Sequence, residues 1–103
     1  MSLQFEHQIT NDNARLSVVG EVDVSNADEL SQALQEVLEA KPARIEVNLS
    51  KVPYIDSTGI GVLVAASKQA EEQGGVLSLG EPQPNVMRVL SMLGVISEFN
   101  LDE

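Results

Sequence analysis

The sequence predicts a small α/β domain with a mixed, mostly parallel β-sheet that begins with an antiparallel hairpin. Short segments in which apolar and polar residues alternate are separated by longer segments whose apolar residues recur at helical spacing. Single helices between successive strands imply parallel pairing through right-handed crossovers. The chain has 103 residues and no internal repeats or low-complexity linkers, so residues 1–103 are expected to form a single domain.

The hairpin is predicted from the N-terminal residues. Within residues 3–9, one parity is held by Leu3, Phe5, His7 and Ile9, with polar residues between them. This two-residue period is typical of a half-buried strand. The turn segment 11–13 (Asn-Asp-Asn) follows, and residues 15–19 form the second predicted strand.

The first predicted helix covers residues 26–40 and ends before Pro42. Its apolar residues at helical spacing are Ala27, Leu30, Ala33, Leu34, Val37 and Leu38. Ser25, followed three residues later by Asp28, resembles a capping arrangement at the start of this helix. A strand over residues 44–49 comes next, and its alternate polar residues indicate partial exposure on one side.

The second helix is predicted to begin after Ser57, with a buried apolar start, and to end at the glycine pair 74–75. A further strand covers residues 76–79. Pro84 favours the first turn of a third helix, because its missing N–H costs nothing there. The predicted buried face of this helix comprises Val86, Val89, Leu90 and Leu93, with Gly94 as the C-terminal cap. A last strand or extended segment is predicted over residues 95–99.

Charge and composition limit the classes of function. The chain has 16 acidic and 6 basic residues and a formal net charge of -10, so it repels phosphate backbones and anionic lipid surfaces. We therefore expect neither nucleic acid nor a membrane as a partner, and a protein with a basic patch fits better. The sequence has no cysteine, which excludes disulfides and thiol catalysis. Without a signal-like N-terminus or a long apolar run, a cytoplasmic location is expected.

Two polar segments follow predicted strands and form the expected functional region. Residues 21–25 (Glu-Val-Asp-Val-Ser) follow the second strand, and residues 54–58 (Tyr-Ile-Asp-Ser-Thr) follow the third. The carboxyl ends of parallel strands form the crevice in which ligands or partners sit. If these strands are neighbours, Asp23 and Ser57 lie on one rim of the domain.

Ser57 occupies the position expected of an N-cap residue, before a helix whose first turn has free N–H donors. On capping statistics alone, a serine at this position is more often a cap than a reaction site. The same donors and the helix dipole tolerate a phosphoryl group, which brings about -1.5 to -2 charges. The neighbouring carboxylate of Asp56 disfavours such a phosphoryl group through like-charge repulsion. A modification of Ser57 would therefore change the surface charge while leaving the fold intact.

Catalytic and cofactor motifs are missing. The chain has no Gly-Lys pair for a P-loop, and the third glycine of a dinucleotide fingerprint beginning at Gly59 falls on Val64. No Gly-x-Ser-x-Gly surrounds Ser57, and the only histidine, His7, is far from it in the sequence, which argues against a catalytic triad. The carboxylates show no metal-ligand spacing. We therefore expect no metal, no cofactor and no enzymatic activity.

Three motifs together resemble a known family. They are residues 20–23 (Gly-Glu-Val-Asp), residues 56–61 (Asp-Ser-Thr-Gly-Ile-Gly) and the Gly-Gly turn at 74–75. Their order and spacing are similar to those of the anti-sigma-factor antagonists, the bacterial stand-alone STAS domains. The resemblance covers nearly the whole chain and implies that residues 1–103 form a single STAS domain. Its Asp-Ser-Thr-Gly core is the most specific part.

The resemblance implies a regulator without catalytic activity that exchanges partners. In its unphosphorylated form, such an antagonist binds an anti-sigma factor that is also a serine kinase, and this releases the sigma factor. The kinase uses ATP to phosphorylate the serine after the aspartate, which is Ser57 here, and a PP2C-type phosphatase resets the switch. The residues expected in the partner interface are Asp23, Ser25 and Asp56, with Thr58 and Gly59 forming its floor.

Each assignment has a structural alternative. Asp23 and Asp56 could serve in loop or cap hydrogen bonds, and Gly59 in close backbone packing. Thr58, a position modified in some relatives, is interpreted first as a hydrogen-bonding residue of the first helical turn.

Two other functions stay open. One is a STAS binding subunit without phosphorylation, in a lipid-transport ATPase or a stressosome-like scaffold; the other is a nucleotide site at helix N-termini, which the charge disfavours.

Overall fold

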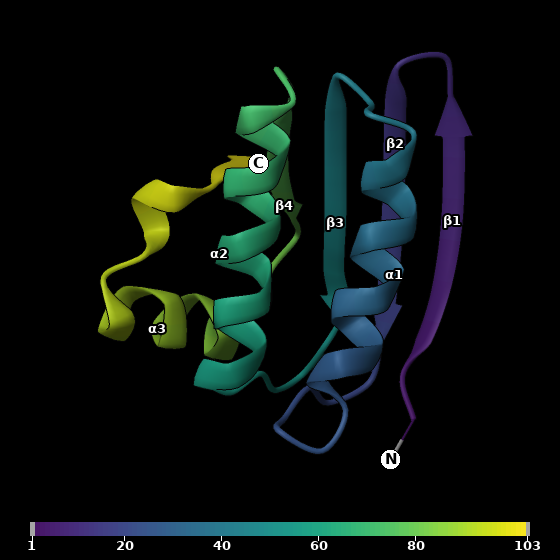
Figure 1. Cartoon of the computed structure of the whole chain (residues 1–103). Helices are drawn as coiled ribbons and strands as arrows, with labels where there is room; N and C mark the ends of the chain where they lie inside the picture. Colours follow the sequence, from purple (N-terminus) through teal and green to yellow (C-terminus); the bar gives the residue numbers. More distant parts are fainter. Residues whose placement is uncertain (1, 103) are drawn as a thin grey trace.

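The computed structural model describes residues 2–102 (Figure 1). Its elements in chain order are β1 (Gln4–Thr10), β2 (Asn13–Val19), α1 (Ala27–Glu39), β3 (Arg44–Lys51), α2 (Ser57–Glu72), β4 (Val76–Gly80), α3 (Pro84–Leu93), the 3-10 helix η1 (Ile96–Glu98) and β5 (Asn100–Asp102). The order predicted from the sequence is confirmed through α3.

The sheet has five strands in the order β1-β2-β3-β4-β5. β1 and β2 form the predicted antiparallel hairpin, with His7 opposite Leu16. The remaining neighbours are parallel, because α1 and α2 each return the chain to the same end of the sheet before the next strand begins. The mixed, mostly parallel sheet predicted from the sequence is therefore confirmed.

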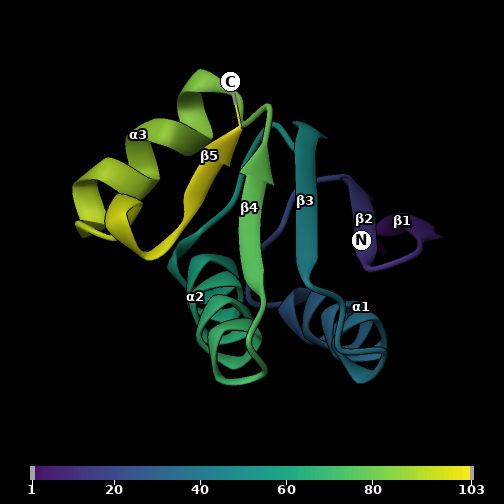
Figure 2. The same ribbon diagram turned by 90° about the horizontal axis from the view of Figure 1, so that it is seen from above.

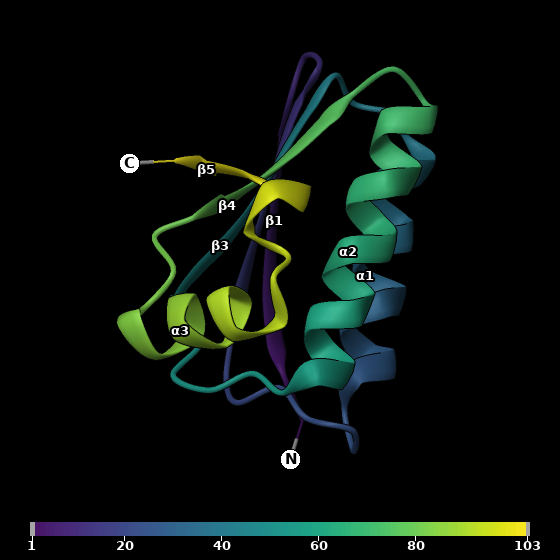
Figure 3. The same cartoon turned by 90° about the vertical axis from the view of Figure 1, so that its left-hand side faces the viewer.

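The helices lie on both sides of this sheet. α1 and α2 lie side by side and cover one face, whereas α3 lies on the other side, near β4 and β5 (Figures 2 and 3). Within the described part of the chain, no helix covers the opposite face of β1, β2 and β3. We call this uncovered surface the open face. No helix among residues 2–102 is long and apolar enough to cross a membrane.

The core fills the space between the sheet and the helices. All six residues predicted from the helical spacing of α1 are buried, from Ala27 to Leu38. They meet the alternate residues of the central strands, which are Leu16, Val18, Ile45, Val47, Leu49, Leu77 and Leu79. Ile60 and Leu63 of α2 join them, as the apolar start of that helix predicts. Apolar burial of this kind is the main favourable contribution to folding.

The C-terminal segment differs from the prediction. Residues 95–99 are not a strand, because Gly94 turns the chain at φ 70° and residues 96–98 then form η1. Phe99 is buried behind this turn, and only then does β5 pair with β4. The predicted face of α3 is buried at Val86 and Leu90, but Leu93 is 46% exposed.

The prediction for the first strand is correct for its position and only partly correct for its burial. Leu3 is buried and Phe5 is half-buried, but His7 is exposed and Ile9 is 55% exposed. β1 is the edge strand of the sheet. The whole strand therefore has a neighbouring strand on one side alone.

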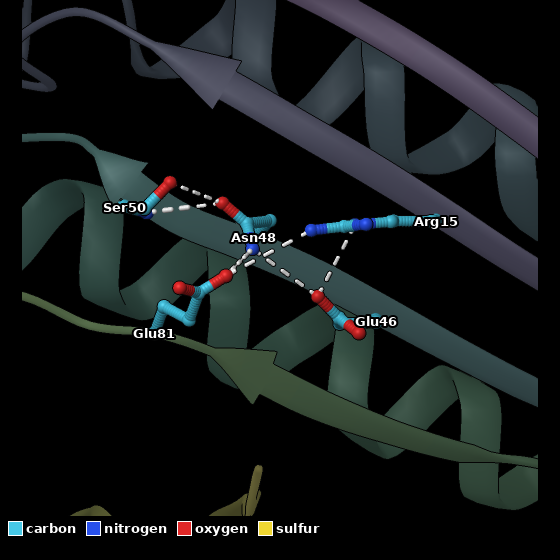
Figure 4. Close-up of polar contacts among 5 residues, drawn as sticks. All are labelled: Arg15, Glu46, Asn48, Ser50 and Glu81. Atoms are coloured by element: carbon cyan, nitrogen blue, oxygen red, sulfur yellow. Dashed lines mark hydrogen bonds and ion pairs between the residues drawn. The ribbon is translucent and has the colours of Figure 1, made fainter. Parts of the chain in front are cut away.

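A buried amide organises the polar residues of the open face. Asn48 is 4% exposed, and its oxygen accepts hydrogen bonds from the backbone N–H and the hydroxyl of Ser50 (3.1 and 2.7 Å). Its Nδ2 donates to Glu46 (3.3 Å) and Glu81 (3.0 Å), and Arg15 lies against the same two carboxylates (Figure 4). Within residues 2–99, no buried side-chain nitrogen or oxygen lacks a partner. The predicted polar side of this strand therefore carries a hydrogen-bond network.

We expect Asn48→Ala to destabilise the fold by about 1–3 kcal/mol, because it leaves the partners of a buried amide unsatisfied. Urea denaturation followed by circular dichroism measures this change. Gln35→Ala is the matched control, because Gln35 bonds Gln69 at the exposed surface, and its effect should stay within about 0.5 kcal/mol. Equal losses in the two variants would contradict a structural role for the buried amide.

Candidate functional site

Two loops at the carboxyl ends of β2 and β3 are joined by backbone hydrogen bonds. The N–H of Val22 donates to the carbonyl of Tyr54 (2.9 Å), and the N–H of Asp56 donates to the carbonyl of Val22 (3.1 Å). Val22 and Ile55 thereby form an isolated parallel bridge. Because β2 and β3 are neighbours, the bridge brings Asp23 next to the start of α2, as the sequence predicts.

Asp56, not Ser57, is the N-cap of α2. Its carboxylate accepts hydrogen bonds from the N–H groups of Thr58 (3.0 Å) and Gly59 (3.1 Å). Ser57 is the first residue of the helix, and its side chain is exposed. The prediction that Ser57 caps the helix is therefore wrong by one residue. The reason is that the carbonyl of Asp56, which is itself extended, already accepts the first helical hydrogen bond, from the N–H of Ile60 (3.0 Å).

Gly59 lies where the start of α2 presses against the bridge between the loops. A Cβ atom at this position would lie 2.6 Å from Val22 Cγ1 and 2.7 Å from Ile55 Cγ1. Both neighbours are fully buried, so they have little room to move. The close-packing interpretation of Gly59 therefore agrees with the structure.

The β2–α1 loop is held by its own side chains. The hydroxyl and the backbone N–H of Ser25 both donate to the carboxylate of Asp23, the second at 2.9 Å. Asn26, which is 2% exposed, accepts from the N–H of Asp23 (3.0 Å) and donates to the carbonyl of Glu21 (2.9 Å). Asn26 is the residue before α1, so the predicted capping role of Ser25 is wrong. The hydroxyl of Ser25 instead orders the carboxylate of Asp23.

The β3–α2 loop is also fixed from the side of α3. Gln83 donates from Nε2 to the carbonyl of Ser50 (2.8 Å), and Asn85 donates from Nδ2 to the carbonyl of Pro53 (3.0 Å). These contacts come from residues some 30 positions further along the chain, and no sequence pattern predicted them. The backbone leading to Ser57 is therefore held by two separate segments.

Two exposed apolar side chains flank the site. Val24 is 75% exposed in the β2–α1 loop, and Tyr54 is 43% exposed in the β3–α2 loop. They were not among the predicted site residues. Each is an apolar residue beside one of the two polar motifs, and this position in the sequence could have identified them. Exposed apolar groups within a polar rim are typical of protein-binding surfaces.

The structure thus gathers the predicted residues at one edge of the sheet. Ser25, Ser57 and Thr58 are exposed, whereas Asp23 and Asp56 are half-buried. Among the side chains that the structure describes, those of residues 2–99, no group of three acidic or histidine residues is arranged to hold a metal ion. Chemically, the rim offers carboxylates and hydroxyls for hydrogen bonding and two exposed serines, of which Ser25 donates its hydroxyl to Asp23.

The two glycines of α2 provide a matched test of the close approach. We expect Gly59→Ala to destabilise the protein by about 1–3 kcal/mol, because the new methyl group overlaps buried side chains. Gly61→Ala, with no atom within 4 Å of the new Cβ, should be neutral or up to about 1 kcal/mol more stable. Thermal and urea unfolding measure both. A stabilised Gly59→Ala variant would refute the close contact.

The hydrogen bonds from the Ser25 hydroxyl and, secondly, from the Ser25 N–H lower the pKa of Asp23. Ser25→Ala should therefore raise this pKa toward the ordinary carboxyl value. A lowered pKa favours the folded state above the unfolded pKa, and this contribution is lost as the pH falls through the folded value. Titration of the Asp23 carboxyl carbon by NMR follows the change directly. An unchanged midpoint in Ser25→Ala would show that the hydroxyl does not set it.

Comparison with known proteins places this geometry in a family. Residues 5–97 match the family described as Mlab, STAS domain. The anti-sigma-B factor antagonist of Bacillus subtilis is 30% identical over 95 residues, which cover 92% of this chain and 86% of that protein. The anti-sigma-B factor antagonist of Staphylococcus epidermidis is 27% identical over 103 residues, covering 100% and 95%.

Solved structures of anti-sigma factor antagonists have the same fold as this chain. A candidate anti-sigma factor antagonist from Thermotoga maritima superposes with a TM-score of 0.87 at 29% identity, covering 96% of this chain and 86% of that one. The Bacillus antagonist SpoIIAA in its unphosphorylated form gives a TM-score of 0.80 at 19% identity, covering 97% and 89%, which shows the shared fold. The chain therefore belongs to the STAS domain family of anti-sigma-factor antagonists.

Proposed function

We propose that this protein is an anti-sigma-factor antagonist controlled by phosphorylation of Ser57. In its unphosphorylated form it binds an anti-sigma factor that is also a serine kinase, and this releases the sigma factor. Phosphorylation by that kinase ends the interaction, and a PP2C-type phosphatase restores it. Because the kinase uses ATP, the switch is placed in the cytoplasm. The protein itself contributes binding and no catalysis.

The position of Ser57 is the observation that carries the proposal. Its exposed side chain follows the capping Asp56 directly, on the rim that Asp23 shares. A kinase needs a hydroxyl that protrudes from the fold, and the first residue of a helix provides one without unfolding it. The serine, the aspartate before it and their place in the chain are also those to which the family resemblance assigns the switch.

The rim around Ser57 is proposed as the partner interface. Asp23, Ser25 and Asp56 supply polar contacts, Thr58 lies beside the serine, and buried Gly59 allows the loops to pack beneath them. The exposed side chains of Val24 and Tyr54 supply apolar contact on either side. A partner surface with positive charge suits this rim, since the chain carries a net charge of -10.

Phosphorylation would act on this interface through charge and volume. A phosphoserine adds about -1.5 to -2 charges at neutral pH. Those charges would stand beside the carboxylates of Asp56 and Asp23, in a contact from which water is excluded. Disrupting a buried charged contact costs roughly 2–5 kcal/mol, which corresponds to a loss of affinity of about 30-fold or more.

Ser57 variants test the proposal. Incubation with the cognate kinase and ATP should place phosphate on Ser57, as seen by mass spectrometry of the peptides. Ser57→Ala should abolish the phosphate and retain kinase binding, whereas Thr58→Ala should still be phosphorylated. Ser57→Asp should bind the kinase at least about 30-fold more weakly by calorimetry.

Ser91→Asp is the control for the added charge, because Ser91 is exposed on α3, which contributes none of the proposed rim residues. It should bind the kinase like the wild type. Phosphate on any other residue alone, or wild-type affinity of Ser57→Asp, would refute the switch. Recovery of a transport ATPase in place of a kinase in a pull-down would favour a STAS subunit without phosphorylation.

A further inference from the structure

The open face of the sheet contains a recess far from Ser57. Its volume is about 290 Å³, and it is lined by Gln8, Thr10, Asn13, Arg15, Arg44, Glu46 and Ser78 among others. Asn13 and Arg44 are the first residues of β2 and β3, so the recess lies at the amino ends of these strands. Ser57 follows their carboxyl ends, and β3 alone spans about 23 Å at about 3.3 Å per residue.

Strand register brings two arginines to this recess. Asn13 lies opposite Arg44, and the next pair on the same face is Arg15 opposite Glu46. The two guanidinium groups therefore come from diagonal positions on adjacent strands. The hairpin adds neutral groups to the same two rungs, because Gln8 is paired with Arg15 and Thr10 with Asn13.

The two arginines differ in how their charge is balanced. The Nε of Arg15 lies 3.3 Å from Glu46, and one Nη lies 3.9 Å from Glu81, so its guanidinium is held in place (Figure 4). Arg44 is exposed and has no ion-pair partner among the residues that the structure describes. This is notable in a chain with 16 acidic and 6 basic residues. The lining residues Arg15, Arg44 and Glu46 together carry a net charge of +1, and the carboxylate of Glu81 beside Arg15 balances that charge.

We propose that this recess binds a small molecule through a carboxylate or phosphate group. Arg44 forms the ion pair with the anion, and the oriented guanidinium of Arg15 supplies further N–H donors. A guanidinium matches the geometry of both oxyanions, and it is the preferred side chain for holding them. The neutral side chains of Gln8, Thr10 and Asn13 offer hydrogen bonds without adding charge repulsion.

The size and place of the recess agree with a small ligand. Its volume of about 290 Å³ lies just below the roughly 300–1,000 Å³ typical of small-molecule pockets. It is separated from the proposed partner rim by the length of the strands, so both can be occupied together. The recess is thus not part of the proposed function, and a result that refutes one of the two proposals does not refute the other.

NMR titration of the full chain tests the proposal. Inorganic phosphate and, in a separate series, succinate are added at constant ionic strength to ¹⁵N-labelled protein. Saturable shifts are expected at the amides of Thr10, Asn13, Arg15 and Arg44, and the Ser57 amide should not move. Saturation by phosphate, succinate or both supports the site and identifies which oxyanion it prefers.

Arg44→Gln should weaken the binding at least tenfold. Arg88→Gln is the matched control, because Arg88 is an exposed residue of α3 that does not line the recess. The substitution removes the same charge and should leave the affinity unchanged. Circular dichroism checks that both variants are folded. Shifts that do not saturate, that spread evenly over the basic residues, or that persist unchanged in Arg44→Gln would overturn the proposal.

Discussion

The bridge between Val22 and Ile55 is the constraint on which the functional edge of the molecule depends. It consists of two backbone hydrogen bonds, to the carbonyls of Tyr54 and Val22, but it fixes three things together. It aligns the two loops, it holds Asp56 extended so that α2 begins at the next residue, and it leaves room for the helix only because Gly59 has no side chain. The exposure of the serine therefore follows from backbone geometry.

The polar side of the sheet supports the same loop. Asn48 binds Ser50, Gln83 binds the carbonyl of Ser50, and Asn85 binds that of Pro53, so the end of β3 is tied to the segment that begins α3. These groups satisfy one another's hydrogen-bonding capacity and thereby order the end of β3. A rim held on both sides suits a switch that works by adding charge at a fixed position, because no element must refold when the charge is added.

Local patterns predicted the elements well, and contacts between distant residues decided the rest. The hairpin, the two crossovers and every buried residue of α1 follow from periodicity. The cap of α2 does not, because aspartate and serine are both good N-cap residues, and only the hydrogen bonds that Asp56 accepts from Thr58, Gly59 and Ile60 distinguish them. The strand predicted over residues 95–99 was wrong for a different reason. A short apolar run after a glycine is compatible with both a strand and a 3-10 turn. The arrangement of Arg15 and Glu81 around Asn48 spans segments that no local pattern connects.

The start of α2 also refines how a phosphate at Ser57 would act. The sequence suggested that free N–H groups of the first turn would partly stabilise it. In the structure, Asp56 already accepts the N–H groups of Thr58 and Gly59, and the N–H of Ile60 donates to the Asp56 carbonyl. Few donors of the turn are left for a phosphate, so most of its charge would face the solvent and the partner. The carboxylate that fixes the helix start would thereby also keep the modification effective as a repulsive group.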